Sequence, residues 1–375
     1  MNGPLRVMHL QKATGIGGSE HHLLTLLTRL DPARVSPYLL VLEEAAHPAQ
    51  SFLTKIAQAD LPHGIAPIGG DLDPTLLFRL AGRFRRWRPD IVHTHLLHAD
   101  LHGIPAARLA GVPGVVSTKH NDDPFRAGVV GRVDAAMARW ADRVIVISDH
   151  LGRFYRSVEG IPAAKLTRIH YGLEANGEVP DGSSVRREFG IGDAPLAGVV
   201  ARLEEQKGHR YLLDAFPTIR AQVPGARLLV AGSGPQEATL RGQVTALGLG
   251  EAVIFAGFRD DVARVMSALD LFVLPSLWEG FGLVLLEAMR AGRAIVATTV
   301  SAIPEIVAAG ESGLLVPPRD AGALAGAVVS LLRDPGRRAA MGAAGRTRLQ
   351  SAFSVGAMVE ATTEVYLAVA RARGR

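Results

Sequence analysis

Residues 271–289, LFVLPSLWEGFGLVLLEAM, join an apolar run to an apolar helical pattern through a loop that holds two glycines. The unbroken apolarity of LFVLP predicts a strand buried on both faces, as a parallel sheet covered by helices requires. Glu279 lies in the loop, and Glu287 follows eight residues later, about two turns into the predicted helix. The helix start exposes backbone amides at Phe281, Gly282 and Leu283 that can hold phosphate or sugar oxygens.

The alternative interpretation of Glu287 is an exposed, salt-bridged helix face. Its neighbours Leu285, Leu286 and Met289 are apolar, so burying the carboxylate there without a partner would be costly.

The same alternation of apolar runs and helical patterns continues along the whole chain. Strands are expected at 5–10, 36–42, 90–95, 114–119, 143–148, 194–201, 227–232, 252–257, 271–275 and 294–298. Strands that alternate with helices predict right-handed crossovers in doubly wound parallel sheets. The expected fold class is α/β, with two Rossmann-like domains that face each other across a cleft.

The stretch 173–193 separates the two halves, because it is rich in glycine and has no sustained periodicity. We expect a linker there, with one domain in residues 1–172 and the other in residues 194–353. The last stretch, 354–373, has the pattern of a long helix with no strand after it.

Composition excludes several classes of protein. The chain has 375 residues, of which 48% are hydrophobic and 21% charged, so it is not mainly disordered. Its net charge of +5 is small for the length; it favours an anionic substrate or membrane surface and does not indicate a nucleic-acid partner. The absence of cysteine excludes disulfides, a thiolate zinc site and a cysteine nucleophile.

The amino terminus has no signal-peptide pattern, and no apolar run approaches the roughly 18–20 residues of a spanning helix. We therefore expect a cytoplasmic protein that at most lies on a membrane. The basic stretch 79–88 could contact anionic lipid there, although its apolar residues also fit an ordinary core-facing stripe.

Ligands of open parallel sheets bind at the carboxyl ends of the strands, so residues there are candidates for a site. In GIGGSE (15–20), Gly17 and Gly18 would let the backbone approach a ligand, although a tight turn would explain them equally and the dinucleotide fingerprint does not match. In ARLEEQKG (201–208), Arg202 and Lys207 lie before a helix and suit a diphosphate. The alternative for that loop is a solvated charged surface.

Seven motifs in order resemble those of the retaining glycosyltransferases of family 4, which have the GT-B fold. They are GIGGSE, ADRVIVISD, VARLEEQKG, LLVAGSGP, FAGF, PSLWEGFGLVLLEAM, and IPEIV followed by GLLVPP. The resemblance covers essentially the whole chain, and its most specific mark is the pair Glu279 and Glu287. It implies that the terminal helix, residues 354–375, returns to the first domain, which binds the acceptor, while the second domain binds the donor.

The resemblance also assigns the donor-binding residues. Arg202 and Lys207 would bind the diphosphate of a nucleotide-sugar, Glu287 the ribose, and Glu279 a hydroxyl of the donor sugar. The remaining positions would meet the donor through their backbone: Gly17, Gly18, Gly232, Phe258, Arg259, Phe281, Gly282, Leu283 and Val284.

His120 aligns with the active-site histidine of the family, which contacts the donor sugar and the acceptor. With Arg202, Lys207 and Glu279 it makes the expected catalytic set. Asp100 and Asp122 are candidates for lining the acceptor pocket.

No metal or cofactor is expected to be required besides the nucleotide-sugar substrate, which could carry UDP, GDP or ADP. His93 and His95 could suggest zinc, but no third ligand is evident. The triplet from Asp71 to Asp73 is similar to the metal motif of the other glycosyltransferase fold, yet a turn with a helix cap explains Asp73. One departure from the family pattern is Tyr171-Gly172, which replaces the usual Asn-Gly after the last strand of the first half.

The expected function is retaining transfer of a sugar to a hydroxyl of a lipid-linked or saccharide acceptor. The alanine-, glycine- and arginine-rich composition suggests a GC-rich bacterium, so the setting would be cell-surface polysaccharide or glycolipid synthesis. The alternatives are an epimerase, hydrolase or phosphorylase of the same fold, and a binding protein that holds a nucleotide-sugar without catalysis.

Overall fold

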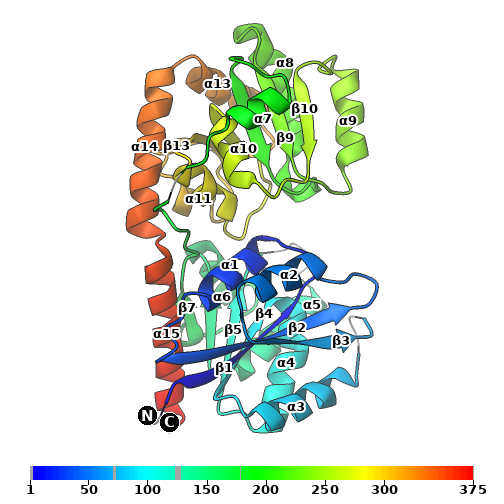
Figure 1. Cartoon of the computed structure of the whole chain (residues 1–375), viewed down its shortest axis with the longest axis vertical. Coiled ribbons are helices and arrows are strands. Elements are labelled where there is room, and N and C mark those ends of the chain that lie inside the picture. Colours follow the sequence, from blue (N-terminus) through cyan, green and yellow to red (C-terminus); the bar gives the residue numbers. More distant parts are fainter. Residues whose placement is uncertain (1–2, 71–72, 123–127, 178, 375) are drawn as a thin grey trace. The chain divides into compact units, whose positions relative to one another are not determined.

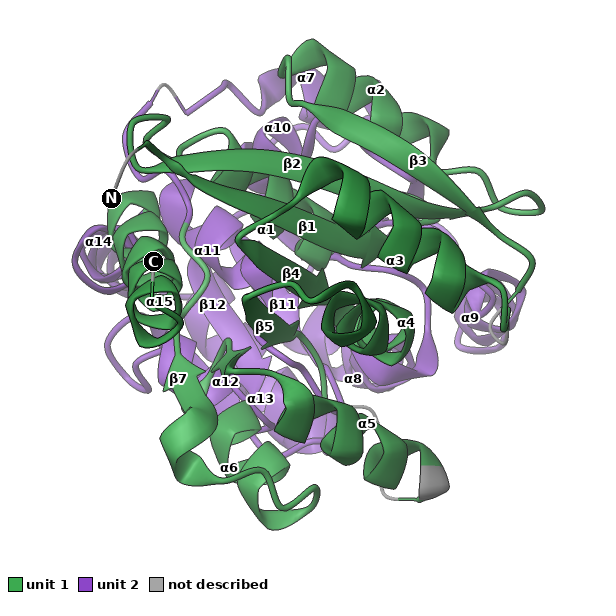
Figure 2. Ribbon diagram, turned by 90° about the horizontal axis from the view of Figure 1, so that it is seen from below, with its two compact units in different colours: residues 1–172, 355–375 green, residues 173–354 purple. Residues whose placement is uncertain are grey.

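The computed structural model describes residues 3–70, 73–122, 128–177 and 179–374 (Figure 1). The chain forms two compact units, which Figure 2 colours separately. Unit 1 comprises residues 1–172 and 355–375, and unit 2 comprises residues 173–354.

Unit 1 is built on a parallel sheet of seven strands in the order β3-β2-β1-β4-β5-β6-β7. The strands are β1 (Leu5–Lys12), β2 (Val35–Glu44), β3 (His63–Ile68), β4 (Ile91–His95), β5 (Gly114–Lys119), β6 (Arg143–Val146) and β7 (Leu166–Arg168). The helices are α1 (Gly18–Leu27), α2 (Gln50–Gln58), α3 (Leu76–Trp87), α4 (Leu96–Ala110), α5 (Val129–Trp140), α6 (Asp149–Ser157) and α15 (Val355–Ala372).

Helices cover both faces of this sheet. Side chains of α1, α2 and α15 form one continuous apolar cluster with β1, β2 and β4. The helices α3 and α5 each pack against α4, and α4 lies against β1, β4 and β5. The central strands are therefore buried on both sides, which explains why β4 and β5 show no alternation of buried and exposed residues.

The face of the sheet toward α4 and α5 contains a buried group of charges. Lys119 of β5 is 1% exposed, and its ammonium lies 2.7 Å from Asp100 of α4 and 2.6 Å from Asp134 of α5. Burial disfavours the charged form of Lys119, but the two carboxylates outweigh it and raise the pKa of the ammonium. Burial also raises the pKa of Asp100, against the opposing effect of Lys119. These charges tie β5 to two helices.

Unit 2 repeats the arrangement with a parallel sheet of six strands in the order β10-β9-β8-β11-β12-β13. The strands are β8 (Leu196–Val200), β9 (Arg227–Ala231), β10 (Val253–Gly257), β11 (Leu271–Leu274), β12 (Ala294–Thr298) and β13 (Gly313–Val316). The helices are α7 (Ser183–Glu188), α8 (His209–Gln222), α9 (Glu237–Ala246), α10 (Val262–Ala268), α11 (Leu283–Arg290), α12 (Ile303–Ile306), α13 (Ala321–Leu332) and α14 (Pro335–Ala352).

The two parallel sheets confirm the α/β fold class. In each sheet the strand order reverses beside the first strand, between β1 and β4 in unit 1 and between β8 and β11 in unit 2. Such switch points leave a crevice at the carboxyl ends of the strands, where ligands of this class bind.

Two segments differ from the sequence expectations. The stretch 173–193 belongs to unit 2 and contains the helix α7, so it is not a structureless linker. The stretch 335–372 has the length of a membrane-crossing helix and reaches a mean hydropathy of 1.2 in its most apolar window. This differs from the expectation that no apolar run approaches the length of a spanning helix. The stretch is divided at Phe353 and Ser354 into α14 and α15, and 56% of that window is buried, as in a core helix.

Replacing Lys119 by Met should destabilise unit 1 by about 3–5 kcal/mol, because Asp100 and Asp134 would stay buried without a cation. The loss should shrink as the pH falls, since protonation neutralises the two carboxylates. Urea unfolding at pH 5 and pH 7 measures both effects. Lys55→Met, on the exposed face of α2, is the control and should change stability by no more than about 0.5 kcal/mol. Equal effects of the two substitutions would contradict this account of the cluster.

Candidate functional site

The predicted donor-binding side chains of unit 2 gather at the carboxyl ends of its two central strands. Arg202 and Lys207 follow β8, and Glu279 follows β11. Because β8 and β11 are neighbours at the switch point, the two loops lie side by side.

Backbone and side-chain contacts hold these two loops together. The amide of Leu277 donates to the carbonyl of Gln206 at 2.7 Å, and Nε2 of Gln206 donates to the carbonyl of Trp278 at 3.1 Å. Gly208 permits this approach, because a Cβ at that position would lie 2.0 Å from the carbonyl oxygen of Pro275. The loops therefore form one surface.

Lys207 and Glu279 pair across these loops, with Nζ and Oε2 2.5 Å apart and both side chains about nine-tenths buried. The hydroxyl of Ser276 also donates to Glu279 at 3.3 Å. Arg202 lies on the surface with its side chain 63% exposed and pairs with Glu204. The loop after β8 therefore carries two cations, the exposed guanidinium of Arg202 and the paired ammonium of Lys207, that can meet a diphosphate.

The helix α11 begins where the sequence predicts, at Leu283. Gly282 precedes it with a φ of 88°, a conformation in which glycine carries no steric cost. The ring of Phe281 is 2% exposed and packs edge-on against Phe353, so only its backbone can meet a ligand. The first turn of α11, with Leu283 and Val284, presents the amides that such a helix end offers to anions.

Glu287 is half-buried on α11, and burial raises the pKa of its carboxyl to about 7, against the opposing effect of Arg290. Among the described residues, its carboxylate has no hydrogen-bond partner within reach. A half-buried carboxylate without donors is a group that a pair of ribose hydroxyls would satisfy.

Three further predicted donor contacts lie on the other side of β8. Gly232 follows β9 with a φ of 143°, and a Cβ there would meet the carbonyl oxygen of Ala201 at 1.9 Å. Phe258, after β10, is 71% exposed. Arg259 beside it is paired with Asp261 and Glu188, which raise the pKa of its guanidinium.

The glycine turn of unit 1 follows β1, as expected. Gly17 is the N-cap of α1, and its amide donates to the carboxylate of Glu20 at 2.9 Å. Neither Gly17 nor Gly18 has a positive φ, and a Cβ on Gly18 would meet nothing within 4 Å. The fold alone does not require glycine at position 18, which leaves room there for a ligand.

His120 lies just after β5 and is 8% exposed. Its Nε2 is 3.2 Å from Nδ1 of His95, and its Nδ1 hydrogen-bonds with the hydroxyl of Tyr171. His22 of α1 stacks on Tyr171 with ring centroids 4.2 Å apart. Tyr171, the residue that departs from the family pattern, is thus in direct contact with the predicted catalytic histidine.

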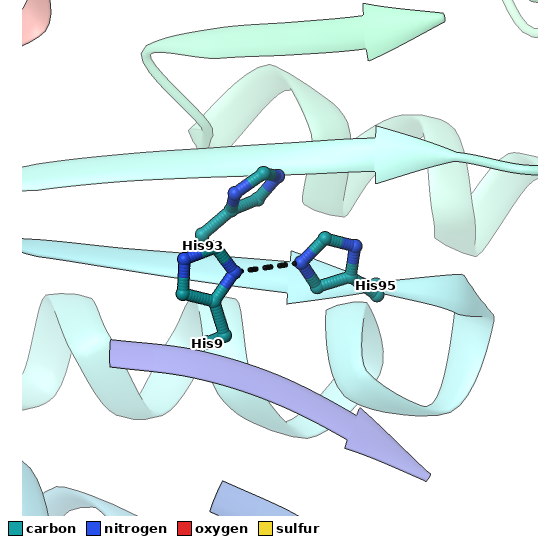
Figure 3. Close-up of side chains that lie close together, drawn as sticks. All are labelled: His9, His93 and His95. Carbon is teal, nitrogen blue, oxygen red and sulfur yellow. Dashed lines mark hydrogen bonds between the residues drawn. The ribbon is translucent and has the colours of Figure 1, made fainter. Parts of the chain in front are cut away.

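Behind His120 the structure adds a third histidine to the pair considered from the sequence. His9 of β1 and His93 and His95 of β4 have ring nitrogens within 4.8 Å of one another, as Figure 3 shows. All three are at most 1% exposed. Burial lowers the pKa of His9 to about 3, and it holds the pKa values of His93 and His95 well below the usual range. The three rings are therefore neutral at pH 7.

The two predicted acceptor residues have different surroundings. Asp122 pairs with His150 of α6 at 2.8 Å, near the carboxyl end of β5. Asp100 is fully buried, and both its oxygens bind side chains of the fold, Thr94 and Lys119. This burial favours a structural role for Asp100 and gives its predicted contact with an acceptor no support.

Asp71 and Leu72 of the D-x-D triplet lie outside the described residues. Asp73 accepts hydrogen bonds from the amides of Thr75 and Leu76 at the start of α3. These contacts are those of a helix cap.

Sequence reasoning missed four side chains beside the predicted site: His9, His22, Tyr366 and the ring of Tyr171. His9 of β1 pairs in register with His93 of β4. A histidine in each of two predicted strands was therefore the signal from which their contact could have been predicted. Nothing local indicates Tyr366, which reaches His93 from α15 near the other end of the chain.

Solved structures with the same two-sheet architecture are GT-B glycosyltransferases. The Anabaena protein HepE in complex with UDP-glucose matches with a TM-score of 0.86 at 24% identity, over 97% of this chain and 99% of that one. Sucrose-phosphate synthase from Thermosynechococcus elongatus matches with a TM-score of 0.80 at 23% identity, over 98% and 100%. These similarities establish the fold.

Sequence comparison identifies the family. The profile of glycosyltransferase family 4 matches residues 16–176, and that of glycosyl transferases group 1 matches residues 183–348. The glycogen synthase of Mycobacterium tuberculosis is 32% identical over 386 residues, which cover 95% of this chain and 92% of the relative. A GDP-mannose-dependent phosphatidylinositol monomannoside mannosyltransferase of the same species is 32% identical over 64% of this chain and 66% of its own. The chain therefore belongs to glycosyltransferase family 4, and the expected enzyme class is confirmed.

Replacing Gly208 by Ala should separate the loops after β8 and β11. Gly225→Ala is the matched control, because that glycine also has a positive φ but a Cβ there would meet nothing within 4 Å. Both variants carry the strain of a left-handed alanine, and Gly208→Ala should cost about 1–3 kcal/mol more for overpacking. Thermal unfolding measures the difference, and equal losses would show that the loops can move apart without cost.

Replacing Glu287 by Gln should change how stability depends on pH. The folded-state pKa of about 7 lies above the ordinary value of 4.5, so the folded protein binds more protons than the unfolded chain between these values. Stability should fall as the pH rises through that range. Glu287→Gln should remove this fall and stabilise the ligand-free protein by about 1–3 kcal/mol at pH 8.

Urea unfolding from pH 4.5 to pH 8 measures this effect. Glu251→Gln, at an exposed position of the same unit, serves as the control and should keep the wild-type slope. If the free energy of unfolding of Glu287→Gln depends on pH as steeply as that of the wild type, burial does not destabilise the charged form of Glu287.

Proposed function

We propose that this enzyme transfers a hexose, with retention of its anomeric configuration, from a nucleoside diphosphate sugar to an acceptor hydroxyl. The observation that carries the proposal is the Lys207–Glu279 pair at the switch point of the second sheet, with Arg202 in the same loop as Lys207. A diphosphate needs cationic donors, and a sugar hydroxyl needs a held acceptor oxygen. Lys207 supplies the cationic donor and Glu279 the acceptor oxygen, and the two side chains hold each other in place.

In the proposed reaction the bond between the anomeric carbon and the phosphate oxygen breaks while the acceptor oxygen attacks the same face. Negative charge builds on the departing diphosphate, where Arg202, Lys207 and the amides at the start of α11 stabilise it. The acceptor's proton passes to the leaving phosphate oxygen. No covalent nucleophile is assigned.

The remaining predicted residues take supporting roles in this proposal. Glu287 holds the ribose hydroxyls, the backbone at Phe258 and Arg259 meets the base, and Gly232 lies beside the nucleotide. His120 contacts the donor sugar and the acceptor from unit 1, while Gly17 and Gly18 let the backbone of α1 approach the donor.

The acceptor proposed is a lipid-linked or saccharide hydroxyl, and the setting is bacterial cell-surface polysaccharide or glycolipid synthesis. The relatives include a GDP-mannose-dependent phosphatidylinositol monomannoside mannosyltransferase and a glycogen synthase, whose names indicate a lipid-linked and a saccharide acceptor respectively. We place the protein in the cytoplasm with peripheral contact to the inner membrane. The exposed Phe78 and the basic residues of α3 support that contact.

A thermal-shift panel of UDP-, GDP- and ADP-sugars identifies the donor, because a ligand that binds the folded state raises the melting temperature. Nuclear magnetic resonance of the product then reports its anomeric configuration. Nucleotide release without transfer to any acceptor would favour a hydrolase. Binding of a nucleotide-sugar without release of the nucleotide would favour a non-catalytic protein. A product with inverted anomeric configuration would reject retention.

Replacing Arg202 or Lys207 by Ala should lower kcat/KM by the equivalent of about 2–4 kcal/mol, because each removes a charged donor to the leaving diphosphate. Arg241→Ala is the matched control. Arg241 is also exposed and also pairs with a neighbouring glutamate, Glu237 at 2.8 Å, but it lies on α9 away from the site loops. Near-normal transfer by both site variants would reject the diphosphate assignment.

A further inference from the structure

A continuous hydrogen-bonded chain runs through the interior of unit 1 and ends at His120. Starting at the inner end, Thr118 contacts Nε2 of His93 at 2.7 Å, and Nδ1 of His93 contacts the hydroxyl of Tyr366 at 2.7 Å. That hydroxyl lies 3.4 Å from Nε2 of His9.

The outer half of the chain continues from the other nitrogen of His9. Nδ1 of His9 is 3.1 Å from Nε2 of His95, the contact drawn in Figure 3. Nδ1 of His95 is 3.2 Å from Nε2 of His120, and Nδ1 of His120 contacts the hydroxyl of Tyr171. Every member of the chain is at most 8% exposed.

The chain has a direction because each neutral imidazole donates at one ring nitrogen and accepts at the other. Satisfying every contact leaves two arrangements. In one, all four histidines carry the proton on Nδ1 and Thr118 donates to His93. In the other, all four carry it on Nε2 and Thr118 accepts. One histidine cannot change alone without leaving a buried nitrogen unpaired.

Thr118 decides between these arrangements. Among the described residues, its hydroxyl has only His93 within hydrogen-bonding distance. If Thr118 accepted from His93, its own hydrogen would be buried without an acceptor, at a cost of about 1–3 kcal/mol. If Thr118 instead donates to His93, its hydrogen is paired and only its oxygen lacks a partner, which avoids most of that cost. The arrangement with every proton on Nδ1 is therefore favoured.

We propose that this chain holds His120 as the Nδ1–H tautomer, so that at the active site it is a hydrogen-bond donor and not a proton acceptor. This inference rests on the proposed function only in assigning His120 to the active site. Thr118, His93, Tyr366, His9 and His95 are then positioning residues, which act through His120 and touch no substrate.

The consequence concerns the donor sugar. An Nδ1–H group gives its hydrogen to an oxygen, which in the ligand-free protein is the hydroxyl oxygen of Tyr171. A hydroxyl oxygen of the sugar is an equivalent acceptor. The acceptor substrate's proton must then leave by another route, as it does when the departing phosphate takes it.

Nitrogen-15 spectra of the histidine rings in the full-length protein test the tautomer directly. We expect His9, His93, His95 and His120 all as Nδ1–H at pH 7.5. An Nε2–H or doubly protonated His120 would overturn the proposal. So would one zinc ion per chain retained by His9, His93 and His95 after dialysis, because a metal occupies the lone pairs that the chain needs.

Tyr366→Phe tests whether the chain imposes the tautomer, since it removes one hydroxyl in the middle and keeps the ring. Its matched control is Thr362→Val, one turn earlier on α15, whose buried hydroxyl donates only to the carbonyl of Met358. Tyr366→Phe should turn His120 into a mixture of tautomers, and Thr362→Val should leave it unchanged. Thr118→Val removes the group that sets the direction and replaces Tyr366→Phe as the test if that variant does not fold.

Activity supplies the second readout, as release of UDP from UDP-glucose or of GDP from GDP-mannose. Tyr366→Phe should lower kcat/KM at least about tenfold, because a histidine in the wrong tautomer contributes little. If the His120 spectrum is unchanged in Tyr366→Phe and in Thr118→Val, the chain does not impose the tautomer and the proposal is overturned. A mixed tautomer with wild-type kcat/KM would instead overturn the assignment of His120 to the active site, while the diphosphate site of unit 2 would stand.

Discussion

The proposed donor site depends on the close approach of two loops at the reversal point of the second sheet. Parallel strands bring the ends of β8 and β11 to the same edge, and Gly208 removes the side chain that would hold their loops apart. Lys207 and Glu279 can then pair at 2.5 Å although 72 residues separate them. Each charge keeps the other in place before any ligand arrives, so binding has less side-chain freedom to remove.

Most of the fold could be predicted, and the donor-site residues could be proposed, because the deciding signals are local. Buried central strands such as β8 and β11 are continuously apolar, and the stretch from β11 to α11 carries strand, loop, carboxylates and helix start within 19 residues, 271–289. The strands β3, β7 and β13 were missed for a physical reason. All three are edge strands. Exposed positions interrupt the apolar pattern in β3, while β7 and β13 have only three and four residues and give too short a signal.

The histidine chain could not be predicted in this way, because its members come from four strands or loops and the terminal helix. The pairing of His9 with His93 follows from the register of β1 and β4, which only the sheet determines. Tyr366 enters from α15, 246 residues after His120. The same limit applies to Asp100, which was a candidate for lining the acceptor pocket although Lys119 holds its carboxylate inside the fold.

The two faces of the first sheet bury polar groups by opposite means, and this contrast bears on catalysis. Toward α4 and α5, Lys119 stays charged because two carboxylates compensate it. Toward α15, no carboxylate among the described residues reaches His9, His93 or His95, so burial keeps the rings neutral. Glycosyl transfer passes through a sugar with positive charge at the anomeric centre. In the proposed active site only His120 lies beside that sugar, and the neutral rings behind it add no positive charge there. As a neutral Nδ1–H donor, the form proposed for it, His120 orients the sugar without repelling it.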